Sequence, residues 1–271
     1  MRDATMAAVI AEEISDNDLI FVGVGTAGRA YTLAVGIPIV AARLAQLAHA
    51  PGADIYVGNL LNPDLENVPL ELNQDSFTRW EGSYAPMDIT YKVDALVRGD
   101  FDVSFESAAQ VDRHGNLNIT QIFNADRGAV RLVGSLAQPE HLAFVRKPIV
   151  VVDLSVRTFV EEVDFVSSFG HRYRGTDRKQ LGYASAGPRL VVTDMCVFEF
   201  KKGHLALRSL HADVSLDDVL DRMAFRPVIP YGNIPVTRMP TEQQLSLISE
   251  EIDPNNVLLG SQEELENDVQ G

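Results

Sequence analysis

The chain has 271 residues, of which 46% are hydrophobic, so it can bury a sizeable core and is neither disordered nor a low-complexity protein. A single cysteine excludes a disulfide framework and any cysteine-rich metal site. The 38 acidic and 23 basic residues give a net charge of −15, which repels phosphate backbones and argues against a nucleic-acid partner. No signal-peptide pattern and no uncharged apolar run of about 18 residues is visible, so we expect a cytoplasmic protein with no membrane partner.

The first two thirds of the chain alternate short apolar runs with helical patterns. A strand is predicted at 19–24, followed by a glycine-rich turn, a helix at 39–48 and a second strand at 54–57. Further apolar runs lie at 101–105, 149–152 and 190–192. Runs that are apolar throughout are typical of strands covered on both faces. The sequence therefore predicts an α/β fold with an open, mainly parallel sheet and helices on both faces.

The C-terminal third has a different pattern. Runs at 197–200 and 204–207 flank Lys201, Lys202 and Gly203, which predicts a β-hairpin. Two capping-box patterns, Ser215 with Asp218 and Thr241 with Gln244, each predict the start of a helix. No change in composition marks a boundary, so we expect one domain over residues 1–260. The acidic segment 261–271 is expected to be a frayed tail.

Three glycines after the first strand match the G-x-G-x-x-G pattern of dinucleotide-binding proteins: Gly23, Gly25 and Gly28. A nicotinamide-binding module is therefore one alternative. Against it, the second strand ends in Gly58 and Asn59, where such a site needs an acidic residue for the ribose. Gly36 and Pro38 are also expected to interrupt a helix that starts at Gly28. A tight turn is the favoured interpretation of the three glycines.

Two further segments carry polar side chains. In 110–118, Gln110, Asp112 and Asn116 either line a ligand site or form an ordinary turn that caps its own backbone, and spacing alone does not decide. Segment 163–170 is either an anion-binding nest or a strand end. The basic segment 171–179 is interpreted as a surface loop. The six histidines have no i, i+3 or i, i+4 spacing and Cys196 lies in an apolar run, so neither a metal site nor a reactive thiol is expected.

Several blocks in one order make the chain similar to the β subunit of class I CoA-transferases of the glutaconate CoA-transferase type. These blocks are 108–118, 163–168, 190–194, 240–242 and 250–254. The resemblance implies an open α/β fold, an α partner subunit in an expected α2β2 assembly, and an acyl-CoA substrate at the subunit interface. It implies no cofactor apart from coenzyme A as part of the substrate.

The family's transferases use a glutamate at the end of the second strand, whose carboxylate attacks the thioester. Here the matching position falls at Gly58, so the resemblance implies a vacated nucleophile position lined by Gly58 and Asn59, with acid–base groups supplied by the partner. Gln110, Asp112 and Asn116 would position the substrate, and the backbone of Gly134 and Ser135 would bind CoA or an oxyanion.

The expected function is accordingly hydrolysis or carbon–carbon cleavage of a carboxylated or cyclic CoA ester. Segment 209–211 and the 110–118 block resemble, in particular, the branch that opens a ring in bacterial steroid catabolism. Two alternatives stay open besides the nicotinamide module. The chain is either a true CoA-transferase that uses Asp64 or Glu66 as its nucleophile, or a scaffold that only stabilises its partner.

Overall fold

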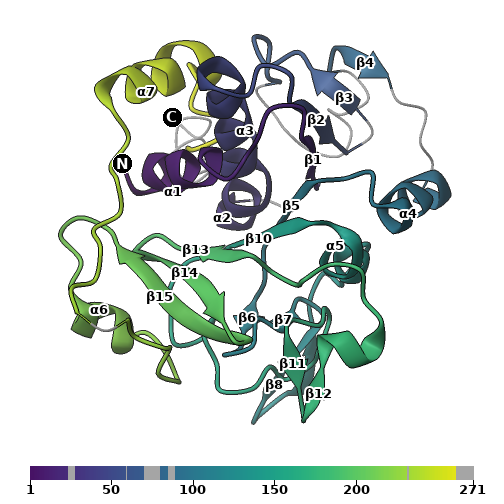
Figure 1. The fold of residues 1–271 in the computed structure, drawn as a ribbon, viewed down its shortest axis with the longest axis vertical. Helices are drawn as coiled ribbons and strands as arrows, with labels where there is room; N and C mark the ends of the chain where they lie inside the picture. Colours follow the sequence, from purple (N-terminus) through teal and green to yellow (C-terminus); the bar gives the residue numbers. More distant parts are fainter. Residues whose placement is uncertain (24–27, 59, 70–79, 85–88, 231, 261–271) are drawn as a thin grey trace. The chain divides into compact units, whose positions relative to one another are not determined.

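The computed structural model describes residues 1–271 except 24–27, 59, 70–79, 85–88, 231 and 261–271 (Figure 1). The chain falls into two compact units. Unit 1 comprises Met1–Lys92, Phe101–Phe105 and Arg238–Gly271, and unit 2 comprises Val93–Asp100 and Glu106–Thr237. The expectation of one domain over 1–260 stays a prediction, and the expected tail at 261–271 lies outside the described residues.

Unit 1 contains a sheet with parallel strands at its centre. Strand β1 (Leu19–Val22) pairs in parallel with β2 (Asp54–Val57) on one side and with β5 (Val103–Glu106) on the other. Strands β3 (Leu60–Pro63) and β4 (Gly82–Tyr84) continue the sheet antiparallel beyond β2. The apolar runs predicted as strands at 19–24 and 54–57 therefore form a parallel pair, and the α/β class is confirmed.

Unit 1 holds several helices, two of which bury most of their residues. They are α1 (Arg2–Ala11), α2 (Gly28–Tyr31), α3 (Ile37–Ala48), the start of α4 (Ile89–Arg98) and α7 (Glu242–Leu247), which continues into a π-helical turn at Ile248–Ile252. Helix α1 packs on α3, and the turn after α7 also contacts α3 (Figure 1). Asp253 and Pro254 follow this turn, so the helix ends where the sequence predicts.

The prediction that Gly36 and Pro38 interrupt the helix after Gly28 is wrong. A π-helical turn at Thr32–Gly36 joins α2 to α3 in one helical segment, and the backbone N–H of Ile37 bonds to the carbonyl of Thr32. Pro38 has no N–H to donate to the preceding turn, and the π-helical turn just before it shifts the hydrogen-bond register at this point. This segment is the one described helix long and apolar enough to cross a membrane, but 72% of its most apolar window is buried, as in the core helix of a globular protein.

Unit 2 holds a second set of strands. Strand β10 (Lys147–Val151) pairs in parallel with β13 (Leu190–Val192), and β14 (Cys196–Lys201) and β15 (His204–Leu210) follow antiparallel, which confirms the predicted hairpin. Unit 2 also has separate two-stranded ribbons, which are β6 (Gln110–Val111) with β7 (Leu117–Asn118), β8 (Gln121–Asn124) with β9 (Gly128–Arg131), and β11 (Arg172–Tyr173) with β12 (Thr176–Asp177).

Helices α5 (Gln138–Phe144) and α6 (Leu216–Leu220) belong to unit 2, and both predicted capping boxes are present. The hydroxyl of Ser215 accepts the N–H of Asp218 at 3.1 Å, and that of Thr241 accepts the N–H of Gln244 at 3.2 Å. Cys196 lies in the core of unit 2 with Phe159 and Phe198. Burial raises the pKa of its thiol to about 12, as expected of an inert core cysteine.

Candidate functional site

Gly58 stands at the carboxyl end of β2, where the resemblance locates the transferase nucleophile. The parallel register aligns Val22 of β1 with Val57 of β2, and the N–H of Gly58 donates to the carbonyl of Val22 at 3.3 Å. Its φ of 59° lies in the left-handed region that glycine tolerates. Ligands of open α/β sheets bind outside the carboxyl ends of parallel strands. Asn59 and residues 24–27, which hold most of the glycine fingerprint, lie outside the described residues.

The two carboxylates offered as alternative nucleophiles lie away from Gly58. Strand β3 runs back along β2 with Leu60 opposite Val57, so Asp64 lies four residues beyond Leu60, roughly 13 Å toward the amino end of β2. The Asp64 carboxylate accepts the side chain of Asn67 at 2.7 Å and the N–H of Glu66 at 3.0 Å, which lower its pKa. Neither Asp64 nor Glu66 is therefore placed to replace a nucleophile at the end of β2.

Lys92, in the first turn of α4, is a charged group of unit 1 that sequence reasoning missed. Its Nζ lies 5.6 Å from the ring centroid of Tyr56 and 5.9 Å from that of Phe21. Burial lowers the pKa of this amine. No pattern in the sequence connects Lys92 with rings 36 and 71 residues earlier, so only the pairing of β1 with β2 reveals the arrangement.

The side-chain amide of Gln110 is bonded within unit 2. Its Nε2 donates to the carboxylate of Asp164 at 3.0 Å. Its Oε1 accepts the amide of Asn118 at 2.7 Å and the backbone N–H of Asp164 at 3.0 Å. Gln110 is 8% exposed. It thus ties the β6–β7 ribbon to segment 163–170, and its predicted role in positioning substrate stays a prediction.

Segment 163–170 is also held by the protein itself. The hydroxyl of Ser167 accepts the N–H of Ile119 at 2.9 Å and lies 2.7 Å from the hydroxyl of Thr120. The hydroxyl of Ser168 donates to Gln138 at 2.9 Å, and Leu117 forms an isolated bridge with Ser168. Both serines are buried, so these contacts favour the strand-end interpretation over the anion-binding nest.

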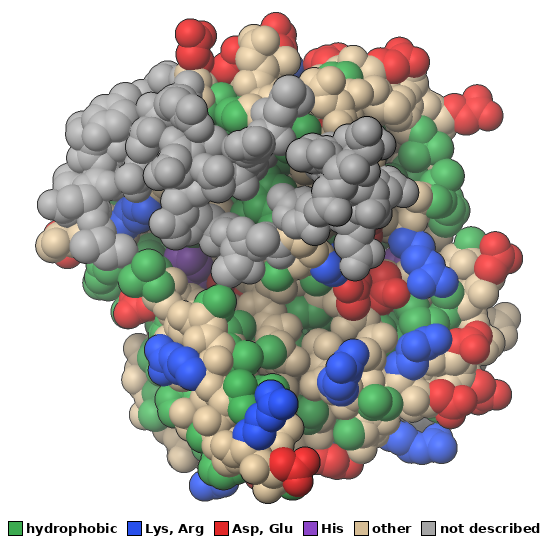
Figure 2. All heavy atoms as spheres, turned by 180° about the vertical axis from the view of Figure 1, so that it is seen from behind, with side chains coloured by type: hydrophobic (Ala, Val, Ile, Leu, Met, Phe, Trp, Pro, Cys, Tyr) green, Lys and Arg blue, Asp and Glu red, His purple; other side chains and the backbone are tan. Residues whose placement is uncertain are grey.

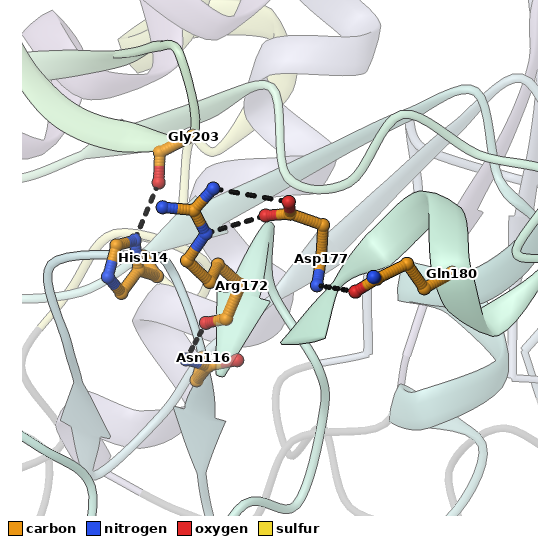
Figure 3. A network of polar contacts seen from close by, with 6 residues as sticks. All are labelled: His114, Asn116, Arg172, Asp177, Gln180 and Gly203. Atoms are coloured by element: carbon orange, nitrogen blue, oxygen red, sulfur yellow. Dashed lines mark hydrogen bonds and ion pairs between the residues drawn. The ribbon is translucent and has the colours of Figure 1, made fainter. Parts of the chain in front are cut away.

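Asp112 and Asn116 close the turn between β6 and β7. The Asp112 carboxylate accepts the backbone N–H of His114 at 2.9 Å, and the backbone and side-chain N–H groups of Asn116 at 3.1 and 2.8 Å. Burial nevertheless raises the pKa of Asp112. Asn116 also donates to the carbonyl of Arg172 at 2.8 Å (Figure 3). These bonds support the ordinary turn, the alternative left open by the sequence.

The arginines of the basic segment 171–179 are bonded within unit 2. Figure 3 shows the guanidinium of Arg172 facing the carboxylate of Asp177, with Nε 2.6 Å from Oδ1. Arg174 pairs with Glu162 at 2.7 Å, and the buried Arg178 donates to the carbonyls of Phe169, Gly170 and Ser185. On the face in Figure 2, the Lys and Arg side chains that the structure describes stand apart from one another.

Gly134 and Ser135 lead into α5. The N–H of Gly134 donates to the carbonyl of Ile119 at 2.9 Å, and the carbonyl of Ser135 accepts the N–H of Gln138 at 2.8 Å. Gly134 has a φ of 99°, which a side chain would strain. Val133 and Leu136, on either side, are 72% and 83% exposed. The segment is thus a fixed turn at the surface of unit 2, and its expected role in binding CoA stays a prediction.

A buried pair that sequence reasoning missed joins Glu106 to His141. The Glu106 carboxylate lies 3.0 Å from Nδ1 of His141, and both side chains are almost fully buried. The two residues are 35 positions apart, one at the end of β5 and one in α5, so no spacing rule could find them. A carboxylate on one ring nitrogen fixes the orientation and tautomer of an imidazole. Among the described residues, no group of three His, Cys, Asp or Glu side chains is placed to hold a metal ion.

Comparison with known proteins supplies the family. No family model matches the chain. It is 30% identical to the β subunit of 3-oxoadipate CoA-transferase of Pseudomonas knackmussii, over 90% of each chain. It is 28% identical to the cholesterol ring-cleaving hydrolase IpdB subunit of Rhodococcus jostii, over 82% of this chain and 83% of the relative.

Solved structures show the same fold. The decarboxylase AibA/AibB matches with a TM-score of 0.77 and 21% identity, covering 96% of this chain and 99% of that one. Glutaconate CoA-transferase of Acidaminococcus fermentans matches with a TM-score of 0.75 and 23% identity, covering 96% and 97%. The nicotinamide-binding alternative gains no support from these matches. With a 30% identical relative aligned over nine tenths of its length, the chain belongs to the family of CoA-transferase β subunits.

Proposed function

We propose that the chain is the β subunit of a hetero-oligomeric enzyme that processes an acyl-CoA thioester by hydrolysis or carbon–carbon cleavage. The observation that carries the proposal is Gly58 at the carboxyl end of β2. Covalent CoA transfer needs a carboxylate there to accept the acyl group, and glycine has no side chain to accept it. The same position with a glycine leaves room for a water molecule or a bulkier acyl group.

The relatives support chemistry other than transfer. One relative is named a ring-cleaving hydrolase subunit. One protein of the same fold is named a decarboxylase. The family resemblance supplies the rest of the proposal: an α subunit in an α2β2 assembly, coenzyme A as part of the substrate with no further cofactor, and a place in the cytoplasm. Acid–base groups would come from the α subunit.

True CoA transfer is the second candidate, because the 30% identical relative is named a CoA-transferase subunit. The positions of Asp64 and Glu66 argue against it, since both follow β3 on its way back from the edge that carries Gly58. The two candidates differ in one observable species. Transfer passes through a CoA thioester on a carboxylate of this chain, whereas hydrolysis releases CoA with no thioester on this chain.

Trapping that thioester tests the proposal. The complex of this chain with its α subunit is incubated with an acyl-CoA and treated with borohydride, and the mass of this chain is measured. We expect no change in mass on this chain. Thioester hydrolysis would release free CoA into solution, whereas carbon–carbon cleavage would leave CoA attached to a changed acyl group. In Gly58→Glu a carboxylate returns, and we expect either an adduct on that residue or an altered product; Gly58→Gln, which carries the same bulk without a nucleophile, is the matched control. A borohydride-sensitive adduct on the unmodified chain would establish transfer instead.

A further inference from the structure

The β8–β9 ribbon of unit 2 carries an apolar pair on each of its faces and buries neither. Its register places Ile122 opposite Val130 and Phe123 opposite Ala129, and successive pairs along a ribbon point to opposite faces. Every residue of these two strands is exposed or half-buried, whereas the strands of the β6–β7 ribbon are fully buried. A two-stranded ribbon without a covering layer is only marginally stable in water. Within the described chain, this ribbon lacks that layer.

The turn that follows the ribbon presents two more apolar side chains. Leu136 and Val133 are 83% and 72% exposed, the two highest values among the large hydrophobic residues of the described chain, and Phe123 is 69% exposed. Two backbone hydrogen bonds, of 2.8 and 2.9 Å, continue the ladder by joining residues 119–120 to residues 132–134. The exposed side chains therefore stand on a fixed backbone. Contiguous apolar surface that a folded chain exposes in this way marks a protein–protein contact.

Two arginines of the same segment have no acidic partner in the described part of the chain. Arg127 precedes β9 and Arg131 ends it, and neither forms an ion pair with a described carboxylate, although the chain has a net charge of −15. The guanidinium of Arg131 lies along the turn, with Nη2 3.1 Å from the place that a Cβ of Gly134 would take. Aromatic residues and arginine are enriched in protein interfaces. The matching surface on a partner is apolar, with carboxylates at its edge.

We infer that this part of unit 2 is the surface on which the α subunit docks, with Phe123 as its aromatic anchor. The inference rests on the proposed function, which supplies the α subunit, and it names the face that receives that subunit. We call this face the ribbon surface, and its apolar members are Ile122, Phe123, Ala129, Val130, Val133 and Leu136.

Two observations favour the α subunit over a second copy of this chain as the occupant. A twofold contact sets one surface against itself, so a second copy would bring the unpaired Arg127 and Arg131 toward the same arginines of its partner. The ribbon also continues without a break into Gly134 and Ser135, the turn that the family resemblance places against an acyl-CoA at the subunit interface. The ribbon surface is therefore continuous with the expected boundary between the two subunits.

Dissociation of the complex tests this assignment. The complex of this chain with its α subunit is prepared unmodified and as Phe123→Ser, Val133→Ser and Val236→Ser, and its dissociation constant is measured by dilution and native mass spectrometry. We expect Phe123→Ser to weaken the complex about thirtyfold, the range for losing an aromatic anchor, and Val133→Ser to weaken it about fivefold. Val236→Ser is the matched control, because Val236 is 69% exposed in unit 2 outside the ribbon surface, and it should leave the constant unchanged.

The melting temperature of this chain separates a loss of docking from a loss of folding. The replaced side chains of Phe123 and Val133 are mostly exposed, so we expect both variants to keep the melting temperature of the unmodified chain. Weaker binding of the α subunit at an unchanged melting temperature is thus the result that supports the ribbon surface.

Each other outcome counts against the inference in its own way. Unchanged dissociation constants in Phe123→Ser and Val133→Ser would overturn it, while the proposed function would stand. Equal weakening in Val236→Ser would also overturn it, because the effect would not belong to the ribbon surface. Loss of a second copy of this chain, with the α subunit still bound, would assign the ribbon to a contact between copies. If the unmodified chain formed no complex with an α subunit, the inference and the proposed assembly would fail together.

Discussion

A single substitution of Gln110, a predicted site residue, can decide whether its side chain serves the fold or the substrate. Its amide bonds to Asn118 and Asp164 at once. Gln110→Met keeps the length of the side chain and removes all three bonds, which leaves the N–H of Asp164 without this acceptor. We expect the free energy of unfolding to fall by about 1–3 kcal/mol, the cost of unsatisfied groups of this kind, measured by urea denaturation.

The same substitution at Gln243, an exposed glutamine in α7, is the matched control and should change stability by less than about 0.5 kcal/mol. The structural role of Gln110 predicts a stability change that is the same with and without substrate. Full stability in Gln110→Met together with weaker binding of acyl-CoA would show that its amide serves the ligand instead.

Residue types at the site could be predicted from the sequence, but their partners could not. Asp112 and Asn116 form a recognisable polar turn, because aspartate and asparagine cap neighbouring backbone groups. The remaining bonds of the Asn116 side chain go to the backbone of Arg172 and Gly170, more than fifty residues away. The position of Lys92 over two aromatic rings could not be predicted from the sequence, because it depends on the pairing of β1 with β2.

At the scale of elements, strands were predicted better than the helix that follows β1. An apolar run of four or five residues indicates a buried strand directly, as at 54–57 and 190–192. The helix propensities of Gly36 and Pro38 predict a break. The helix nevertheless continues past both residues through the π-helical turn. The reason lies in packing: a Cβ on Gly36 would lie 1.8 Å from the carbonyl oxygen of Leu258, which is distant in sequence.

Gly36→Ala therefore tests propensity against packing. Alanine is the better helix former by up to about 1 kcal/mol, but its methyl group would force the backbone at Leu258 away from the helix. We expect a net loss of about 2 kcal/mol or more in the free energy of unfolding, since a backbone carbonyl cannot rotate aside as a side chain does. Ala48→Gly, at an exposed position of α3, measures propensity alone. A more stable Gly36→Ala protein would show that the close approach at Leu258 is not required.

At the scale of the whole molecule, stability should respond to pH through histidines of unit 2. The ring centroids of His114 and His204 lie 4.6 Å apart, and those of His171 and Phe200 lie 4.4 Å apart with the planes tilted by 37°. Burial lowers the pKa of His171, with the charges of Arg178 and His114 adding to it. Burial likewise lowers the pKa of His204, together with His114, Arg172 and Arg113.

A histidine whose pKa is lowered by folding binds its proton less readily in the folded protein than in the unfolded chain. Its contribution to stability is complete above the unfolded pKa of about 6.5 and is lost as pH falls through the lower folded value. We expect the melting temperature to decrease as the pH is lowered from 7.5 to 5.5. Asp112 and Asp253 act with the opposite sign, because burial raises their pKa values and their protonation favours the folded state.

His204→Gln isolates the histidine contribution from that of the carboxylates. It removes one group that binds its proton less readily in the folded protein and leaves Asp112 and Asp253 in place, so its melting temperature should fall less steeply with acidification than that of the unmodified chain. Parallel curves for His204→Gln and the unmodified chain would show that His204 does not contribute to the acid response, because only a change of slope reports a change in protons bound on unfolding.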